Sequence, residues 1–350
     1  MDFKKKYLAK QRDNRFVMEE PPFPKIVKID ICNMCNYACV FCPQAKQTGK
    51  QGNINDELCI KIIKDAYRAG ADEICLSSTG EPLLNINLEK YIMTAKETGY
   101  KYIFFNTNGY LMDKERSESI LASGVDSIKF SINAGSKETY KLVHGVDGYE
   151  RVIENLIQLS KIRTEKQIDC KLYVSYVAIK PSLREVSALK NRIAAYVDDI
   201  IVMNANKRGG SIREMDERLY IGEDTYSYQY PCSQLFHNIY VSAEGYVNIC
   251  CQDFENLAVV ADLNEMDIAE AWNCREFVAF RQKYLQRNLA NTLCINCIYG
   301  KEDKVIPLNK EKAYFKESNI KIENLKSRID VLGDLAKSEE QSALNMRETV

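Results

Sequence analysis

The chain has 350 residues, of which 45% are hydrophobic and 28% are charged, the composition of an ordinary globular protein. Its 48 basic and 49 acidic residues give a net charge of −1, so the charge balance does not indicate a nucleic-acid-binding protein. No apolar run is long enough to cross a membrane and none follows the basic N-terminus, so we expect a cytoplasmic protein without a secretory signal.

From residue 25 to about residue 205, apolar segments typical of strands alternate with amphipathic segments typical of helices. The expected strands are Lys25–Ile31, Glu73–Ser78, Lys101–Asn108, Ser127–Asn133, Lys171–Ile179 and Asp199–Asn204. The expected helices are Asn55–Ala69, Asn87–Thr98, Asp113–Ser123, Ser136–Ile162 with an interruption near Gly145, and Ser182–Tyr196. Six such units predict a parallel sheet covered by helices, and six are too few for a closed eight-stranded barrel. We therefore expect an α/β fold, a partial (β/α)6 barrel, with a doubly wound sheet as the second choice.

After residue 205 the alternation of strands and helices stops. The chain divides into an N-terminal extension (1–24), the barrel (25–205), a polar linker (206–231), a small α+β cap domain (232–300) and a charged helical tail (301–350). In the cap, the pattern predicts a hairpin of Asn238–Val241 and Tyr246–Ile249, then one helix from about Ile268 to Leu285. The tail is expected to be a surface helix with a frayed end.

The chain contains 13 cysteines, an odd number and far fewer than a disulfide scaffold has. Ten of them fall into two groups, which in a reducing compartment indicates metal binding or catalysis. The first group is Cys32, Cys35, Cys39 and Cys42, and the second is Cys232, Cys250, Cys251, Cys274, Cys294 and Cys297. The scattered Cys59, Cys75 and Cys170 are expected to be buried packing residues, as is Cys274 within its helical stretch.

Three cysteines of the first group, Cys35, Cys39 and Cys42, have the spacing C-x3-C-x2-C directly after the first expected strand. Three thiolates on one short loop can hold one face of an iron–sulfur cluster, for which four cysteines are the common ligand set. A [4Fe–4S] cube with three ligands keeps one iron open, and an open position lets a metal site bind and activate another molecule. The alternative is a zinc site with Cys32 as the fourth ligand.

This motif, in this position, resembles the hallmark of the radical S-adenosylmethionine (SAM) superfamily. The resemblance implies that Cys35, Cys39 and Cys42 hold a [4Fe–4S] cluster whose open iron binds the amino and carboxylate groups of SAM. It also implies reductive cleavage of SAM to methionine and a 5′-deoxyadenosyl radical, which abstracts hydrogen from a substrate. Cys32 is then a packing residue, and a flavodoxin or ferredoxin is the expected reductant.

Further segments resemble the superfamily in the same order along the chain, each after an expected strand. Ser78-Thr79-Gly80-Glu81-Pro82 is similar to the Gly-Gly-Glu-Pro motif that meets the SAM amino group, with Thr79 in place of the first glycine. A carboxylate suits an ammonium group, and glycine allows close approach of the backbone. The SAM-binding residues that the resemblance implies are Phe41, Gly80, Glu81, Pro82, Asn108, Ser131 and Asn133. His144, on the same rim, is expected either to touch SAM or to cap a helix.

The second cysteine group resembles the cap domain called SPASM, or twitch in its shorter form. The residues that match are Cys232, then Cys250 in a G-x4-C hairpin, then Cys294 and Cys297. No cysteine follows Cys297, so the resemblance implies one auxiliary [4Fe–4S] cluster held by these four thiolates, with Cys251 as an alternative to Cys250. Either Cys251 or Cys274 can serve as a hydrogen donor to substrate. The alternative is a structural zinc site with four cysteine ligands.

These features imply a radical SAM oxidoreductase that acts on a small molecule. The single-cluster cap resembles that of an aminocyclitol dehydrogenase of the superfamily, and a cap cluster can accept an electron. We therefore expect two-electron oxidation of a polar, sugar- or cyclitol-like substrate, in which the cofactor carries the difficult chemistry. The alternatives are an epimerase and a peptide-modifying enzyme, although residues 1–24 are too short for the leader-binding domain of many peptide-modifying relatives. The remote alternative is a cysteine-rich metal-binding module without catalytic activity.

Overall fold

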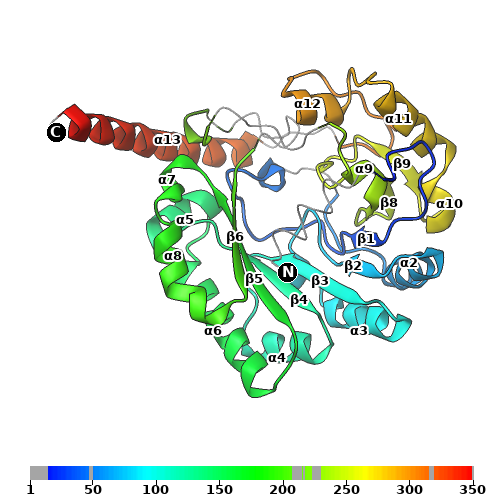
Figure 1. The fold of residues 1–350 in the computed structure, drawn as a ribbon, viewed down its shortest axis with the longest axis horizontal. Coiled ribbons are helices and arrows are strands. Elements are labelled where there is room, and N and C mark those ends of the chain that lie inside the picture. Colours follow the sequence, from blue (N-terminus) through cyan, green and yellow to red (C-terminus); the bar gives the residue numbers. More distant parts are fainter. Residues whose placement is uncertain are drawn as a thin grey trace.

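The computed structural model describes residues 15–46, 50–206, 215, 217–222, 230–314 and 319–348. Six parallel strands form its centre: β1 (Ile26–Ile29), β2 (Glu73–Cys75), β3 (Tyr102–Thr107), β4 (Ser127–Ser131), β5 (Lys171–Ala178) and β6 (Asp199–Asn204). Strands that follow one another in the chain are neighbours in the sheet, and Figure 1 shows the sheet curving with helices on its outer side. The expected strands and the partial barrel are confirmed.

Helices cover the outer face of this sheet. They are α2 (Asp56–Ala69), α3 (Leu88–Thr98), α4 (Lys114–Ala122), α5 (Lys137–His144), α6 (Tyr149–Glu165), α7 (Lys180–Leu183) and α8 (Val186–Ile193). In α2, the Asn55 side chain accepts a hydrogen bond from the Leu58 backbone N–H at 3.0 Å, and the helix ends at Gly70. Such caps satisfy backbone groups that a helix end leaves without partners, which is why they also mark helix ends in the sequence.

The main core lies between the sheet and these helices. Along β1, Val27 and Ile29 are fully buried on the helix side, whereas the alternating Lys28 is only partly buried. The Lys28 ammonium lies 3.4 Å from the Tyr240 hydroxyl, on the inner face of the sheet. Since successive side chains of a strand point to opposite faces, the inner face of the barrel is the polar one.

The cap continues the barrel sheet. Strand β7 (Asn238–Val241) pairs in parallel with β1, and β8 (Tyr246–Asn248) and β9 (Val259–Asp262) add to it in antiparallel fashion. The nine strands therefore have the order β6-β5-β4-β3-β2-β1-β7-β8-β9. The cap helices are α9 (Gln234–His237), α10 (Ile268–Trp272), α11 (Arg275–Leu285) and α12 (Leu293–Tyr299). The expected hairpin is confirmed, and it is built onto the barrel rather than separate from it.

The single helix expected from about Ile268 to Leu285 is wrong, because the chain breaks there into α10 and α11. Cys274 lies between them with extended backbone, φ −64° and ψ 158°, and its thiol donates to the Val260 carbonyl at 3.4 Å. The buried Arg281 holds the corner by donating to the Trp272 carbonyl and to the Asn273 Oδ1, both at 2.9 Å. Apolar residues continue at helical spacing on both sides of the break, so the sequence pattern conceals it.

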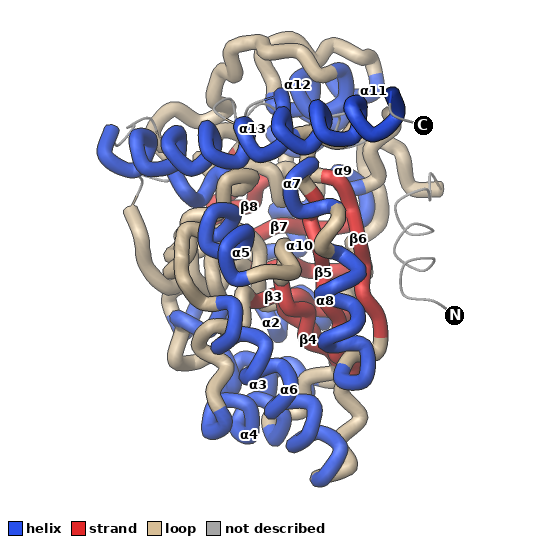
Figure 2. The backbone as a smooth tube through the Cα atoms, turned by 90° about the vertical axis from the view of Figure 1, so that its left-hand side faces the viewer, coloured by secondary structure: helices blue, strands red, loops and turns tan. Residues whose placement is uncertain are grey.

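The tail contains helix α13 (Asn319–Glu348), and one face of this helix is buried, which was not expected from the sequence. Leu325, Ile329, Leu332 and Ala336 form one buried stripe at spacings of four, three and four residues. This stripe packs against the end of α5, against α7 and against the short 3-10 helix η1 (Pro43–Lys46). Figure 2 shows α13 lying across that end of the barrel.

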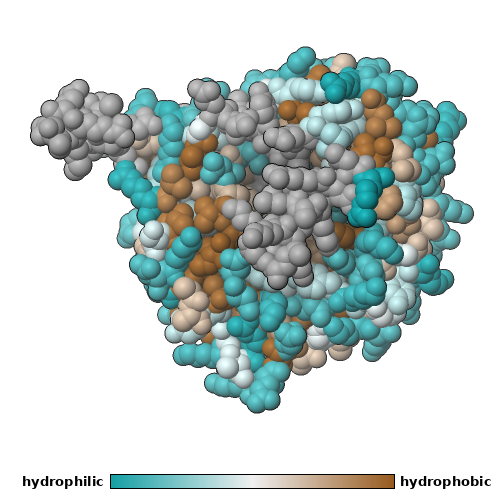
Figure 3. Space-filling view, in the orientation of Figure 1, coloured by the Kyte–Doolittle hydropathy of each residue, from teal (hydrophilic) through white to brown (hydrophobic). Residues whose placement is uncertain are grey.

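The surface is mainly hydrophilic, with a strip of hydrophobic side chains over β6 and α7 in the view of Figure 3. The exposed hydrophobic side chains of these two elements include Leu183 of α7, 42% exposed, and Met203 of β6, 37% exposed. Within the part of the chain that the structure describes, no helix combines the length and apolar character that crossing a membrane requires. Most of the linker expected over 206–231 lies outside the described residues, although Leu219 and Tyr220 are buried near α13.

Candidate active site

The loops that follow β1 to β4 meet at one rim, and the cysteine loop after β1 forms part of it. None of Cys35, Cys39 and Cys42 is in a disulfide. Burial raises the pKa of the Cys39 thiol well above its usual value, and the neighbouring thiols of Cys42 and Cys35 raise it further. The Cys42 N–H donates to the Cys39 carbonyl at 3.0 Å, so these two cysteines lie on one turn of the loop. Cys32 is 1% exposed and its sulfur contacts its own loop, accepting from the Met34 backbone N–H at 3.4 Å.

Backbone hydrogen bonds attach the cysteine loop to the end of α5. The Ala38 N–H donates to the His144 carbonyl at 3.1 Å, and the Val40 N–H donates to the Val143 carbonyl at 2.9 Å. The His144 ring lies with Nδ1 3.1 Å from the Cys39 sulfur and with Nε2 3.4 Å from the Asn133 backbone N–H. Burial lowers the pKa of His144 to about 3, so its imidazole is neutral. His144 therefore links the end of β4 to the cysteine loop.

Glu81 is the acidic residue of the rim and is 2% exposed. One carboxylate oxygen accepts from the Thr107 hydroxyl at 2.7 Å and from the Leu83 N–H at 3.1 Å. The other accepts from the Asn108 N–H at 2.7 Å, and the Asn108 side-chain amide donates to the Asn36 side chain at 2.7 Å. These contacts join the turn after β2 to the end of β3 and to the cysteine loop, so Glu81 has a fixed orientation.

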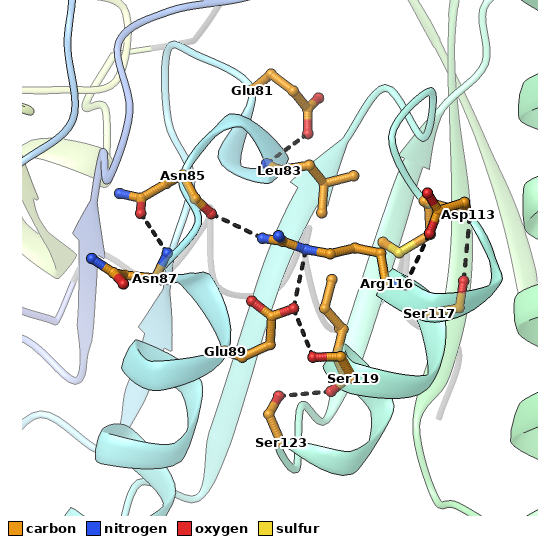
Figure 4. Close-up of polar contacts among 12 residues, drawn as sticks. Glu81, Leu83, Asn85, Asn87, Glu89, Asp113, Arg116, Ser117, Ser119 and Ser123 are labelled. Carbon is orange, nitrogen blue, oxygen red and sulfur yellow. Dashed lines mark hydrogen bonds and ion pairs between the residues drawn. The ribbon is translucent and has the colours of Figure 1, made fainter.

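A second set of contacts supports the turn that carries Glu81. Figure 4 shows the Arg116 guanidinium of α4 between Asn85 and Glu89. It donates to the Asn85 carbonyl at 2.9 Å and lies 3.0 Å from the Glu89 carboxylate. The Asn85 side chain in turn donates to the Ile31 carbonyl at 2.8 Å, at the end of β1. Nothing in the sequence pattern singled out Arg116 or Asn85 for this role.

The other expected SAM-binding residues do not all lie on the rim beside Glu81. Asn133 is buried, and its Oδ1 accepts from the Val177 N–H at 2.7 Å. Ser131 is partly buried at the end of β4, 3.5 Å from the Ser175 hydroxyl. Pro82 opens the short helix after Glu81. Phe41 is 6% exposed and belongs to the apolar cluster under α13. Ser131 ends β4, the strand next to β3, and Asn133 follows it, whereas Phe41 packs toward the tail helix.

We expect Gly80→Ala to weaken SAM binding about tenfold or more, the effect of roughly 1.4 kcal/mol. A Cβ at Gly80 would lie 2.0 Å from the Cys32 carbonyl oxygen and 2.6 Å from that of Met34. Both neighbours are backbone, so the turn must move, and overpacking of this kind typically costs about 1–3 kcal/mol. Titration calorimetry of the reconstituted protein measures this change. The control is Gly52→Ala, because nothing lies within 4 Å of a Cβ there; equal SAM affinity in both variants would contradict this role of Gly80.

We also expect SAM affinity to fall at acidic pH. Burial raises the pKa of Glu81 to about 7, so the carboxylate is present above that pH and is protonated below it. Only the carboxylate attracts an ammonium group, so the loss of affinity between pH 8 and pH 6 should be about tenfold. SAM itself titrates, so the effect is read as the difference between wild type and Glu81→Gln. A parallel pH dependence in the two proteins would exclude Glu81 as its source.

Five cysteines gather in the cap, none of them in a disulfide: Cys232, Cys250, Cys251, Cys294 and Cys297. Burial and the neighbouring thiols of Cys251, Cys294 and Cys297 raise the pKa of Cys250 well above its usual value. Burial, with smaller effects of Cys297 and Cys251, raises the pKa of Cys232 to about 12. Both Cys250 and Cys251 therefore belong to this group.

The donor sets fit iron–sulfur clusters. They consist of thiols alone, three on the rim loop and five in the cap, and thiolates are the ligands that such clusters use. A zinc ion would need its cysteine sulfurs about 2.3 Å from one point. In the described residues, no group of three or more His, Cys, Asp or Glu side chains is arranged to hold a metal ion, and this includes both cysteine groups.

A small cavity of about 20 Å³ lies between the barrel and the cap. Its lining includes Asp30 and Thr79 from the barrel and Glu244, Asn248, Cys250 and Cys251 from the cap. Asp30 follows β1 directly, accepts from the Thr79 hydroxyl, and has its pKa raised to about 7 by burial. The Asn248 Oδ1 is buried and accepts no hydrogen bond from the described residues. The cavity therefore combines polar groups with two cysteines of the cap group.

Residues 29–174 match the radical SAM superfamily, and residues 232–298 match SPASM, an iron–sulfur cluster-binding domain. The chain contains a radical SAM domain and a SPASM domain. Both matched stretches contain the cysteine groups described above, so the resemblance inferred from the motifs is confirmed. The radical SAM and SPASM domains imply iron–sulfur clusters and SAM binding.

Relatives of this radical SAM protein include several named "Probable GTP 3′,8-cyclase". One from Saccharolobus islandicus is 32% identical over 130 residues, 37% of this chain and 42% of that protein. One from Sulfurisphaera tokodaii is 23% identical over 203 residues, 58% of this chain and 59% of that protein. This chain thus spans less than two thirds of the length of these relatives.

Solved structures share the fold of this radical SAM protein. Streptococcus suis SuiB bound to the precursor peptide SuiA has a TM-score of 0.61 at 16% identity, covering 79% of this chain and 70% of that one. BtrN in complex with AdoMet and 2-DOIA has a TM-score of 0.53 at 17% identity, covering 80% and 96%. The enzyme anSMEcpe with bound AdoMet has a TM-score of 0.56 at 12% identity, covering 89% and 99%. At these identities the similarity establishes the fold.

Proposed function

We propose that this chain is a radical SAM oxidoreductase that removes two electrons from a polar, sugar- or cyclitol-like substrate. The supporting observation is the lining of the small cavity between barrel and cap, of about 20 Å³, which brings Cys250 and Cys251 of the cap group together with Asp30 and Thr79 of the barrel. A substrate between barrel and cap would have the SAM-binding rim on one side and an electron acceptor on the other.

In this proposal, Cys35, Cys39 and Cys42 hold the first [4Fe–4S] cluster, and Glu81 and Asn108 orient the SAM amino group. When bound, this cluster supplies the electron that cleaves SAM, and the resulting radical takes one hydrogen atom from the substrate. Cys232, Cys294 and Cys297, with Cys250 or Cys251, hold one auxiliary [4Fe–4S] cluster. A flavodoxin or ferredoxin in the cytoplasm is the proposed reductant.

Groups that line the cavity can accept the proton and the electron that the oxidation releases. An alcohol becomes a ketone when its carbon loses a hydrogen atom and its oxygen then loses a proton while one electron leaves. Asp30 can take the proton, because burial raises its pKa to about 7. The electron passes to the cap, whose cysteines border the same space. Asn248, Glu244 and Thr79 supply the hydrogen-bonding groups that a hydroxyl-rich substrate requires.

Epimerisation is the second candidate, and one observation favours it. Of the two cysteines that could donate a hydrogen atom, Cys251 lines the cavity, whereas the Cys274 thiol donates to the Val260 carbonyl. A thiol in the cavity could return hydrogen to the opposite face of a substrate radical. Peptide modification is the third candidate, since SuiB and anSMEcpe, which share the fold, have been solved with peptides.

One experiment separates these candidates. The reconstituted protein is incubated anaerobically in D2O with SAM, dithionite and a panel of cyclitols, aminosugars and hexoses, and the products are analysed by mass spectrometry. The oxidation proposal predicts a product that has lost two hydrogens and forms a hydrazone. A product of unchanged composition that carries one deuterium would establish epimerisation instead. Turnover of a short peptide, with none of the sugar-like compounds changed, would overturn the proposed substrate class.

A further inference from the structure

The C-terminal helix α13 docks directly over the cysteine loop. Its buried residues Leu325, Ile329 and Leu332 share one apolar cluster with Val40 and Phe41 of that loop. The segment between Cys39 and Cys42 is thereby covered by a helix almost 300 residues later in the chain. Burial of this kind stabilises each large apolar side chain by about 1.5–3 kcal/mol, so α13 contributes to holding the loop in place.

Arg328 is the polar residue of α13 at this contact. Its guanidinium donates to the Ala38 carbonyl at 2.6 Å and to the Leu142 carbonyl at 3.2 Å. Ala38 belongs to the cysteine loop and Leu142 to α5, so one side chain bridges the two segments that the backbone hydrogen bonds already join. A planar guanidinium can hold two acceptors in this way, whereas an ammonium group acts as a point charge.

The close approach of Arg328 depends on a neighbouring glycine. Gly145 ends α5 with φ +75°, and a Cβ there would lie 2.7 Å from the Arg328 Nη1 and 2.9 Å from its Cζ. The space that the guanidinium occupies is therefore available only because residue 145 has no side chain.

The positive charge of Arg328 acts on the rim. Its guanidinium is bonded to the carbonyl of Ala38, the residue directly before Cys39, so the charge lies beside the cysteine loop. Arg328 is partly buried, and its hydrogen bonds to Ala38 and Leu142 both go to backbone carbonyls. A charge in such surroundings is screened less than a surface charge.

We propose that Arg328 is a positioning residue for the SAM cluster: it fixes the Cys35–Cys42 loop against α5, and its charge stabilises the reduced cluster. The inference rests on the proposed function, because it takes Cys35, Cys39 and Cys42 as the ligands of that cluster. It assigns α13 to the catalytic unit rather than to the surface.

Two variants separate the charge from the bridge. Arg328→Gln removes the charge, and Arg328→Lys keeps the charge but cannot donate to both carbonyls in the same geometry. The control is Arg218→Gln: Arg218 lies 3.1 Å from Asp334 of α13, so this change loosens the docking of the same helix away from the cysteine loop. All three are made in the full chain, together with wild type.

Two measurements are made on the reconstituted proteins. An EPR redox titration follows the signal that changes when SAM is added, which identifies the cluster with the open iron. A chelator assay gives the rate of iron loss from it. For Arg328→Gln we expect the reduction equilibrium to shift about tenfold toward the oxidised cluster, a potential about 59 mV lower for one electron. For Arg328→Lys we expect the wild-type potential, and in both variants iron loss about tenfold faster than in Arg218→Gln.

The outcomes distinguish this inference from the function on which it rests. If wild type shows no SAM-sensitive signal, the proposed function fails. If wild type shows the signal and Arg328→Gln keeps both the potential and the rate of iron loss of Arg218→Gln, the role of Arg328 is wrong while the proposed function stands. An equal loss of iron in Arg218→Gln and the Arg328 variants would assign the effect to helix docking alone and would likewise overturn it.

Discussion

Cys39→Ala is expected to abolish reductive cleavage of SAM while the cap cluster remains. Cys39 is the middle cysteine of the rim loop, and two remaining thiolates cannot hold a cluster with one open iron. Loss of a residue that hydrogen-bonds to a metal ligand typically lowers metal affinity or activity about 10–100-fold. Loss of the ligand itself should therefore lower the rate of SAM cleavage by more than about 100-fold. The cap group lies on other elements, and its cysteines are unchanged by the substitution.

The measurement is 5′-deoxyadenosine, quantified by chromatography after incubation with SAM and dithionite. Cys170→Ala is the matched control, because it removes a buried thiol that lies just before β5, away from both cysteine groups. In the described residues, this thiol donates a hydrogen bond to the Lys171 carbonyl. The control should cleave SAM at the wild-type rate. Wild-type cleavage by Cys39→Ala would show that the rim loop does not hold the reactive cluster.

Cys294→Ala is expected to separate SAM cleavage from substrate oxidation. Cys294 and Cys297 lie one turn apart on α12, and burial together with the Cys297 and Cys232 thiols raises the pKa of Cys294 well above its usual value. Without Cys294 the auxiliary cluster loses a ligand, so the electron left on the substrate radical has no acceptor. SAM is still cleaved, because the rim loop is intact, but the oxidised product should fall at least about 100-fold.

The ratio of oxidised product to 5′-deoxyadenosine measures this separation. Cys274→Ala is the control, since its thiol donates to the Val260 carbonyl and does not line the cavity. That variant should keep the wild-type ratio. An unchanged ratio in Cys294→Ala would mean that the cap cysteines do not accept the electron, and the oxidoreductase proposal would lose its physical basis.

Local features of the sequence were sufficient to predict the barrel. The signals that predict it are short-range ones. They are the alternation of side chains in strands such as Lys171–Ile179, the helical periodicity of Asn55–Ala69 and the helix cap at Asn55, and the structure follows them. The spacing of Cys35, Cys39 and Cys42 is equally local. Residues within one loop or helix can therefore be assigned from the chain alone.

Contacts between distant segments were not predicted. Arg328 reaches Ala38 across 290 positions, and the Asn248 amide, Glu244 and Asp30 meet only because β7 pairs with β1. The apolar stripe that includes Leu325 and Leu332 covers about two heptads. Its spacing is typical of a helix with one apolar face, but it does not identify the segments that cover this face. The break at Cys274 was hidden for a related reason, because Arg281 of α11 and Val260 of β9 stabilise it through contacts that the local apolar pattern does not record. Tertiary packing of this kind overrides the local pattern.

The most direct test is the iron and sulfide content after anaerobic reconstitution of wild type and of a variant with Cys35, Cys39 and Cys42 all changed to Ala. Two [4Fe–4S] clusters predict about eight irons per chain in wild type and about four in the variant. About four irons in wild type and none in the variant would contradict the account, because the five cap cysteines would then hold no cluster and the proposed oxidation would have no electron acceptor.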